Sequence, residues 1–230
     1  SAVAVAAAFA GAKGAFFLPV SKSGDAVRAN KYLVQQKVTD VILVGEVDSV
    51  LRSKLTSSGI NYRTFSAGTT AGVSTLLATE LGALGDVVLA SDDDPTTWPL
   101  AVSLATRKKA PLLMLHGNVL SPELSLWLAT QSPSNTFAVG NASALPDSAL
   151  AGLPNPKRMN TADLALASLI AARSVSGVVR GTALASTNVN TEAALVAAST
   201  GLPLIYLDSQ LQGDLLDWLR RQSLAAVVID

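Results

Sequence analysis

Short apolar runs and helix-like segments alternate along the chain, and the middle of the sequence shows the pattern most completely. The apolar runs are continuous, which is typical of strands covered on both faces. The segments between them carry apolar residues at helical spacing, and one begins with Ser121-Pro122-Glu123, a typical helix start. The predicted strands and helices are, in chain order, 86–91, 98–109, 111–115, 121–130, 136–140 and 161–173.

Strand and helix thus alternate in the steps of βαβ units. Such an alternation predicts a mainly parallel sheet with right-handed crossovers and helices on its faces. The fold class that we expect is therefore α/β, made of Rossmann-like three-layer units. The apolar segment from Ser1 to Ala10 lacks the basic leader of a signal peptide, so we interpret it as a structural helix.

The sequence repeats itself with a period of about 95 residues. Val41–Gly45 returns as Thr136–Gly140, and Arg63 is followed by Arg158, both at a shift of 95. A third copy begins near Ala183. Tandem copies of one unit are more typical of a binding or scaffolding array than of an enzyme, whose active site is usually a single asymmetric arrangement.

The repeats divide the chain into about two and a half units, which is compatible with a pseudo-threefold arrangement. We expect unit one over 1–83 without its first strand, a complete unit two over 84–176, and a truncated unit three over 177–230. Unit one starts at the helix equivalent to 98–109, and unit three stops at its third strand, 226–230. Two explanations fit: the chain is an excised part of a longer protein, or a permuted set of elements closes the fold.

Composition excludes several classes of function. The net charge is zero, with 17 basic and 17 acidic residues, so the chain lacks the basic surface of a nucleic-acid-binding protein. The absence of cysteine excludes disulfides, thiolate metal sites and thiol nucleophiles. No apolar run is long enough for a transmembrane segment. Short basic clusters at 107–109, 157–158 and 220–221 are interpreted as solvated helix ends and loops.

Two groups of residues deserve a test as catalytic or metal-binding sites. Asp92-Asp93-Asp94 follows a predicted strand, at the sheet edge where α/β folds bind ligands, and His116 follows the next strand. Three consecutive carboxylates do not converge on one ion, so we expect a turn and a helix cap there. We expect His116 to be a solvent-facing loop residue. The sequence therefore predicts no catalytic residue and no metal site.

The glycine-rich segments do not predict a cofactor site either. Gly11–Ala15 precedes an expected strand, whereas a phosphate loop follows one. Gly68–Val73 enters a helix, but no Lys-Ser or Lys-Thr pair follows it. We interpret both segments as turns and caps, and we expect no cofactor.

The candidates for ligand binding are residues that recur in two units or that we expect to be exposed. Arg63 and Arg158 are basic, and a guanidinium suits bidentate recognition of phosphate or carboxylate. Either arginine could instead hold a loop carbonyl or a helix C-terminus. Trp98 has no counterpart in the other units and is the aromatic residue expected to be exposed. Asp93 is the fourth candidate for ligand binding. Three further aromatic residues occupy matching helix positions and are expected to pack as core anchors: Tyr32, Trp127 and Trp218.

Several strings resemble a known family, the cell-wall-binding type 2 repeat of Gram-positive surface proteins. They are Val88–Ser91 and the helix after it, Ala110–Leu113, Val139-Gly140, and Lys157–Met159 leading into an alanine-rich helix. The resemblance covers nearly the whole chain. It implies three Rossmann-like modules in a three-lobed assembly, which holds exported proteins on the envelope by binding anionic cell-wall polymers.

The chain also departs from the family pattern. The family's double glycine after the third strand is Gly45-Glu46 and Gly140-Asn141 here. Arg63 and Arg158 stand without the Arg-Tyr pair that follows in the family. The resemblance therefore implies the fold more firmly than the ligand.

Three hypotheses follow. The first is a non-catalytic bacterial cell-envelope module, extracellular or wall-associated, that binds an anionic cell-wall polymer or another envelope protein. The rival is an α/β enzyme or small-molecule-binding domain with a cleft near Asp92–Asp94 and His116. The third is a purely structural docking domain of a larger exported protein, whose sign would be an exposed apolar patch where the incomplete units end.

Overall fold

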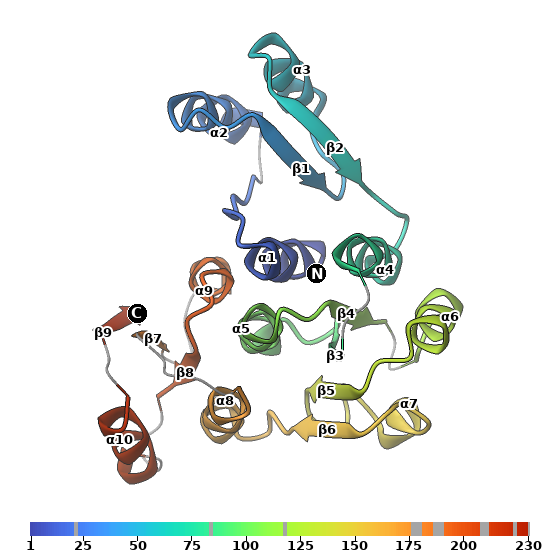
Figure 1. The fold of residues 1–230 in the computed structure, drawn as a ribbon, viewed down its shortest axis with the longest axis vertical. Coiled ribbons are helices and arrows are strands. Elements are labelled where there is room, and N and C mark those ends of the chain that lie inside the picture. Colours follow the sequence, from blue (N-terminus) through green and yellow to red (C-terminus); the bar gives the residue numbers. More distant parts are fainter. Residues whose placement is uncertain are drawn as a thin grey trace.

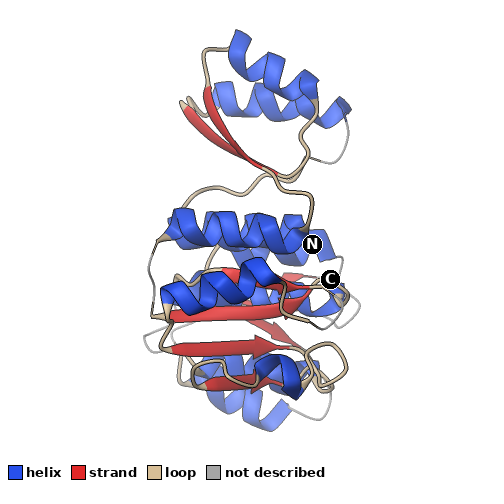
Figure 2. Cartoon of the chain, turned by 90° about the vertical axis from the view of Figure 1, so that its right-hand side faces the viewer, coloured by secondary structure: helices blue, strands red, loops and turns tan. Residues whose placement is uncertain are grey.

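The chain folds into parallel β-sheets with helices packed on their faces (Figures 1 and 2). The structure, a computed structural model, describes residues 1–20, 23–82, 85–116, 119–175, 181–185, 191–207, 212–222 and 225–229. Every strand pair in these ranges is parallel, which confirms the predicted α/β class with Rossmann-like units. The expected unit boundaries at 83/84 and 176/177 fall on residues outside the described ranges.

The middle sheet has four strands in the order β4-β3-β5-β6. Its strands are β3 (Asp86–Ser91), β4 (Leu112–Leu115), β5 (Asn135–Val139) and β6 (Pro156–Met159). The first three confirm predicted strands. The sequence pattern missed β6 because Pro156, Lys157 and Arg158 give it no apolar run, and the basic cluster 157–158 lies on this strand rather than in a loop. An edge strand tolerates such residues because only one side of it is paired.

Helices cover both faces of the middle sheet. They are α5 (Trp98–Lys108), α6 (Pro122–Gln131) and α8 (Leu164–Arg173), with the short η1 (Pro95–Thr97) and α7 (Asp147–Leu150) between strands. As predicted, Ser121 caps α6, because its hydroxyl accepts a hydrogen bond from the Leu124 amide at 3.3 Å. Asp163 caps α8 in the same way through the Leu166 amide at 2.8 Å.

The first unit has the same helices but a smaller sheet. Its elements are α1 (Ala2–Lys13), α2 (Ser23–Gln35), β1 (Asp40–Val44), α3 (Ser49–Ser57), β2 (Asn61–Phe65) and α4 (Thr70–Leu81). In the described ranges only β1 and β2 pair. The strand expected after Gly11–Ala15 does not form, and residues 15–20 have no regular secondary structure. The physical reason is that no counterpart of β3 is present to pair with it.

The third unit repeats the first three strands of the middle sheet. It contains β7 (Gly181–Ala185), α9 (Thr191–Ser199), β8 (Leu204–Tyr206), α10 (Gln212–Arg220) and β9 (Ala225–Ile229). The strand order β8-β7-β9 matches β4-β3-β5. The predicted last strand is β9, and Asp230 lies outside the described residues.

Three equivalent helices, α1, α5 and α9, pack against one another at the centre of the molecule (Figure 1). Their core side chains are small: Ala4, Ala7 and Ala8 of α1 are fully buried. The closest approach is at Gly11, where a Cβ atom would clash with the side chain of Thr106 on α5 and would lie 2.7 Å from the Ser199 carbonyl oxygen on α9. This arrangement around one axis is the pseudo-threefold packing that the repeats predict.

Neighbouring units are also joined by a repeated serine contact. Ser74 on α4 accepts a hydrogen bond from the Met114 amide of β4 at 3.3 Å. Ser168 on α8 accepts one from the Tyr206 amide of β8 at 3.0 Å. Because β4 and β8 lie at sheet edges, each serine satisfies a backbone amide that has no neighbouring strand. A helix of one unit therefore completes the sheet of the next.

Candidate functional site

A cleft of about 530 Å³ lies beside the amino-terminal ends of β3 and β5, where several basic residues meet. Its basic residues come from three elements: Lys108 ends α5, Lys157 and Arg158 lie on β6, and Arg173 ends α8. Asp86 is the one acidic residue among those that line it. The remaining lining residues are Asn135, Phe137, Met159, Ile170 and Ser174.

Lys108 is the buried member of this group, with a side chain that is only 10% exposed. Its Nζ lies 3.1 Å from Asp86 Oδ2 and 3.9 Å from the centre of the Phe137 ring. The other oxygen of Asp86 accepts a hydrogen bond from Asn135 Nδ2 at 2.7 Å. The charge of Lys108 is therefore already neutralised, and this residue organises the floor of the cleft.

Lys157 and Arg173 carry the exposed charge of the cleft. Lys157 Nζ lies 5.4 Å from the Phe137 ring, and no carboxylate pairs with it among the residues that the structure describes. Arg173 Nη2 donates to the Asp214 carbonyl at 3.5 Å, which leaves most of its guanidinium available. Arg173 also ends α8, where a positive charge is favoured by the helix dipole. The cleft thus contains two exposed cations, Lys157 and Arg173, beside Lys108, whose charge is already neutralised by Asp86.

Arg107, next to Lys108, is turned into the protein. Its Nη1 donates to the Ala172 carbonyl of α8 at 3.1 Å, and burial lowers the pKa of Arg107 to about 10. This arginine joins α5 to α8 and is not a surface charge.

Arg158 holds a loop together. Its Nη1 donates to the carbonyls of Gly140 and Asn141 at 3.3 and 3.2 Å, and its Nη2 lies 2.6 Å from Asp147 Oδ1. The side chain is only 20% exposed. Arg158 thus contacts loop carbonyls after β5 and the start of α7, and its contact with a ligand stays a prediction.

The strand register changes which residues are equivalent. The Gly45 amide donates to the Phe65 carbonyl, and the Gly140 amide donates to the Met159 carbonyl. Two residues before these acceptors lie Arg63 and Lys157, so the equivalent basic pair is Arg63 and Lys157 rather than Arg63 and Arg158. A shift of one residue moves a strand side chain to the opposite face of the sheet. Between its third and fourth strands, the middle unit is therefore one residue shorter than the first unit. A comparison at a constant shift of 95 does not reveal this deletion.

Arg63 is exposed but paired. Its Nη2 lies 2.8 Å from Glu80 Oε1 of α4, and its guanidinium carbon lies 5.7 Å from the Phe65 ring. The hydrogen bond to Glu80 raises the pKa of Arg63, and the same bond lowers the pKa of the Glu80 carboxyl. Arg63 lies in a different sheet from Arg158 and does not line the basic cleft.

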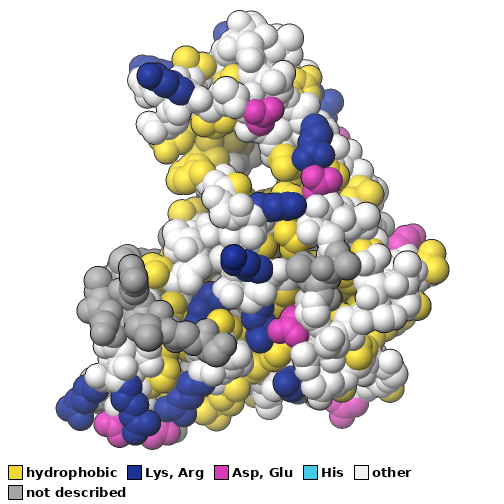
Figure 3. Space-filling model, viewed as in Figure 1, with side chains coloured by type: hydrophobic (Ala, Val, Ile, Leu, Met, Phe, Trp, Pro, Cys, Tyr) yellow, Lys and Arg dark blue, Asp and Glu magenta, His cyan; other side chains and the backbone are white. Residues whose placement is uncertain are grey.

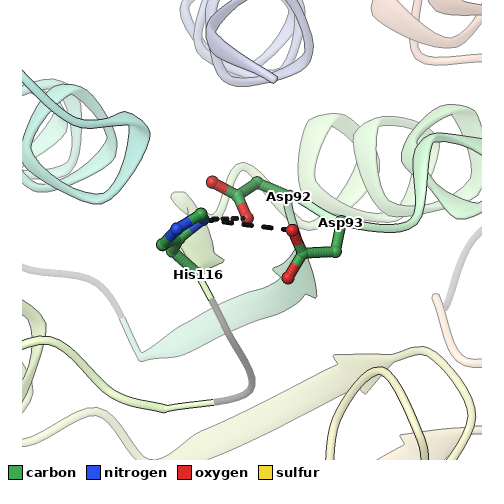
Figure 4. Close-up of side chains that lie close together, drawn as sticks. All are labelled: Asp92, Asp93 and His116. Carbon is green, nitrogen blue, oxygen red and sulfur yellow. Dashed lines mark hydrogen bonds and ion pairs between the residues drawn. The ribbon is translucent and has the colours of Figure 1, made fainter.

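The acidic turn and the histidine do come together (Figure 4). His116 Nδ1 lies 3.1 Å from Asp92 Oδ1 and 4.0 Å from Asp93 Oδ1, and the hydrogen bond to Asp92 raises the pKa of the histidine. One ligand atom from each residue lies within 4.8 Å of the others, a spacing that suits a divalent cation. His116 is nevertheless 77% exposed, as expected for a loop histidine.

The same segment forms a turn, as the sequence indicates. Asp94 accepts a hydrogen bond from the Thr96 hydroxyl at 2.6 Å, and its carbonyl accepts one from the Thr97 hydroxyl at 2.9 Å. The hydroxyl of the buried Ser91 belongs to the same turn and accepts a hydrogen bond from the Asp93 amide at 3.2 Å.

The aromatic residues serve mainly as anchors. Trp98, expected to be exposed, is half-buried, and its indole N–H donates to the Ser91 carbonyl at 2.9 Å. Trp127 is buried and donates to the Thr79 hydroxyl at 3.1 Å, and Trp218 is buried as well. Tyr32 is partly exposed and packs against the Phe16 ring at 5.7 Å between centroids. The prediction of core anchors is therefore confirmed for the two tryptophans.

The basic cleft itself was not predicted from the sequence. Its signal was present in the basic clusters at 107–109 and 157–158, which the sequence pattern assigns to helix ends and loops. The first does end α5, but the second lies on β6, and pairing of β6 with β5 brings it beside Phe137. Clusters almost fifty residues apart meet only because the parallel sheet places strand beginnings at one edge.

Comparison with known proteins shows similarity at the level of the fold. No protein-family model matches the sequence, and no curated protein matches it. Cwp6 from Clostridium difficile superposes with a TM-score of 0.80 at 15% sequence identity, over 98% of this chain and 39% of that one. Cwp8 from Clostridium difficile gives a TM-score of 0.77 at 16% identity, over 99% of this chain and 42% of that one. This chain therefore spans about two fifths of the length of these structural relatives, and its fold is theirs.

Proposed function

We propose that the chain is a non-catalytic module of a bacterial cell envelope that binds an anionic cell-wall polymer through the basic cleft. The observation that carries this proposal is the pair of exposed cations, Lys157 and Arg173, at a cleft where Asp86, the one acidic residue among the described residues that line it, is already paired with Lys108. In this proposal the stretches 1–83, 84–176 and 177–230 are three copies of one unit, of which the middle one is complete.

The chemistry of the cleft supports this proposal. Ammonium and guanidinium groups bind phosphate and carboxylate, the charged groups of anionic polymers. The net charge of the chain is zero, so attraction of a polyanion depends on local clusters. Exposed single contacts are weak, but a polymer offers many charges, and repeated weak contacts give avidity.

The fold also supports a position in the cell envelope. Two solved structures that share it, Cwp6 and Cwp8, are Clostridium difficile cell wall proteins. None of the helices in the described ranges is long and apolar enough to cross a membrane. We infer an extracellular or wall-associated position, with a polymer or another envelope protein as the partner.

Sedimentation with purified bacterial cell walls tests the proposal. The chain is expected to co-sediment with intact walls, to be released as salt rises, and to lose binding when the anionic polymers are stripped. The double variant Lys157→Glu with Arg173→Glu should lose binding under conditions where the double variant Arg28→Glu with Lys31→Glu, an equal change in charge at exposed sites on α2, retains it. Equal binding by the cleft variant and by the control would exclude the cleft, and no binding by the unmodified chain would exclude the polymer.

A second candidate function is a docking domain, favoured by exposed apolar side chains in the first unit. Phe16, Leu18, Val20 and Ile42 are all more than a third exposed. This is the apolar patch that the docking hypothesis expects where a unit is incomplete. It does not involve the basic cleft, which lies in the middle unit.

A further inference from the structure

The first unit contains a large apolar hollow of about 1100 Å³ between α1, residues 15–20, α2 and β1. Figure 3 shows hydrophobic side chains gathered around this hollow, between the α2–β1 part and α1. Protein interiors are packed to crystal density and seldom contain voids larger than a water molecule. A hollow of this size, lined mostly by apolar residues, therefore indicates the place of a structural element and not a packing defect.

The middle unit shows what that element is. There β3 lies between β4 and β5 and pairs with both. In the first unit β1 corresponds to β5, and residues 15–20 take the place of β4. Both walls of the β3 position are present, and both line the hollow. The third unit has the same central strand, β7, between β8 and β9.

Apart from Asp40 at its start, β1 carries no charged residue and no proline along its free edge. Edge strands are usually short, charged, bulged or interrupted by proline. Val41, Ile42, Leu43 and Val44 form a continuous apolar run, which is typical of an interior strand with neighbours on both sides. On the opposite wall, which contains one proline at Pro19, Phe16 is 68% exposed.

The carboxyl end of β1, at one end of the hollow, indicates how the strand that fills the hollow would connect to α1. A Cβ on Gly45, just after β1, would lie 3.9 Å from the Cβ of Ala2, so the carboxyl end of β1 lies beside the start of α1. In the middle unit β3 leads through η1 directly into α5, and Trp98 at the start of α5 is bonded to Ser91 at the end of β3. A strand parallel to β1 would end where it can enter α1 in the same way.

We propose that the hollow binds one parallel β-strand of about six apolar residues, which pairs with β1 and runs into α1 as β3 runs into α5. The pairing of β3 with β5 gives its register: the counterpart of Val88 lies opposite Ile42, and the counterpart of Ala90 lies opposite Val44. The occupant has the chemistry of residues 87–91 of β3, uncharged and mostly apolar, and not that of a polymer. The proposal is independent of the basic cleft.

A graft tests the proposal. A copy of residues 87–96 is fused ahead of Ser1, so that Ser1 takes the place of Thr97; Asp86 is left out to keep an acid away from Asp40. The thermal midpoint is expected to rise by about 5 °C or more, because several apolar side chains become buried. The amides of β1 are expected to become protected from hydrogen exchange. The matched control carries aspartate at the copied positions of Val88 and Ala90 and should show neither effect.

Cross-linking tests the register without relying on stability. The chain has no cysteine, so introduced thiols are the only ones. Ile42→Cys should form a disulfide with a cysteine at the copied position of Val88 but not at that of Leu89, because neighbouring residues on a strand point to opposite faces. No gain in protection and no selective cross-link would overturn the proposal. Dimerisation of the unmodified chain that protects β1 and disappears in the graft would also overturn it, in favour of a second copy as occupant.

Discussion

The strands β1 and β5 are counterparts, yet they lie in opposite environments. β1 has the more apolar sequence, Asp-Val-Ile-Leu-Val against Asn-Thr-Phe-Ala-Val. Ile42 of β1 is nevertheless 37% exposed, whereas its counterpart Phe137 is 3% exposed. The difference arises from the neighbours, since β5 has a strand on each side and β1 has one. Apolar pattern shows what a strand is suited to, and the presence of neighbours decides how much of it is buried.

Truncation of a leucine in the middle sheet is expected to lower the stability more than truncation of an apolar residue on β1. Leu89 on β3 is fully buried, and Leu89→Ala should lower the free energy of unfolding by about 3 kcal/mol or more. Ile42→Ala on β1 should lower it by about 1 kcal/mol or less, because part of that side chain is already in contact with water. Urea-induced unfolding of the two variants measures both losses. Equal losses would show that the first unit is as tightly packed as the middle one.

A substitution at the central axis tests whether the helices of the three units are tightly packed there. Gly11→Ala places a methyl group between α1, α5 and α9 and should cost about 2 kcal/mol of stability through overpacking. Gly68→Ala is the control, because nothing lies within 4 Å of a Cβ at that position. Thermal unfolding compares the two. A neutral Gly11→Ala would mean that the helices at the axis are farther apart than the structure has them.

The two arginines provide a smaller contrast between the units. Arg158→Gln removes three hydrogen bonds from a largely buried guanidinium and should lower stability by about 1 to 2 kcal/mol. Arg63→Gln breaks an exposed ion pair and should leave the thermal midpoint unchanged. Differential scanning calorimetry gives both values. Similar losses for the two variants would show that the contacts of Arg158 stabilise the protein no more than the exposed ion pair of Arg63 does.

Much of the fold could be predicted from the sequence, because its signals are local. Continuous apolar runs predict β3, β4 and β5, and Ser121-Pro122 predicts the start of α6. The strand β6 could not be predicted, since its residues pair at a sheet edge and are mostly polar. The strand expected after Ala15 was wrong for the opposite reason, because its pattern is apolar but it has no partner strand. Strand formation depends on pairing that a single segment does not contain.

The candidate site was harder to predict than the fold. The one-residue deletion before Arg158 is invisible in a comparison by constant spacing, and only the backbone hydrogen bonds show that Lys157 takes the position of Arg63. The cleft joins the ends of α5 and α8 with β6, which are far apart in sequence. His116 was placed correctly on a solvent-facing loop, but its pairing with Asp92 required the structure.

The smallest expected effect concerns the pair of His116 and Asp92. Asp92 favours the protonated imidazole, so the pKa of His116 should lie above its ordinary value of 6.5, and Asp92→Asn should bring it down. Protonation strengthens this contact, so any stabilisation is present at low pH and is lost as the pH rises through the raised pKa. Titration followed by NMR measures the pKa in both proteins. An unchanged pKa in Asp92→Asn would show that the contact is not formed in solution.

The three helices at the central axis limit how this protein can change its length over evolution. Solenoid proteins gain and lose whole repeats easily, because each repeat contacts only its two neighbours along a line. Here α1, α5 and α9 all contact one another, and Gly11 leaves no space between them. A fourth copy would have no position at this axis, and the loss of one copy would expose the buried alanines of the other two. Gain or loss of a single repeat is therefore disfavoured, and growth is expected through whole closed sets of three.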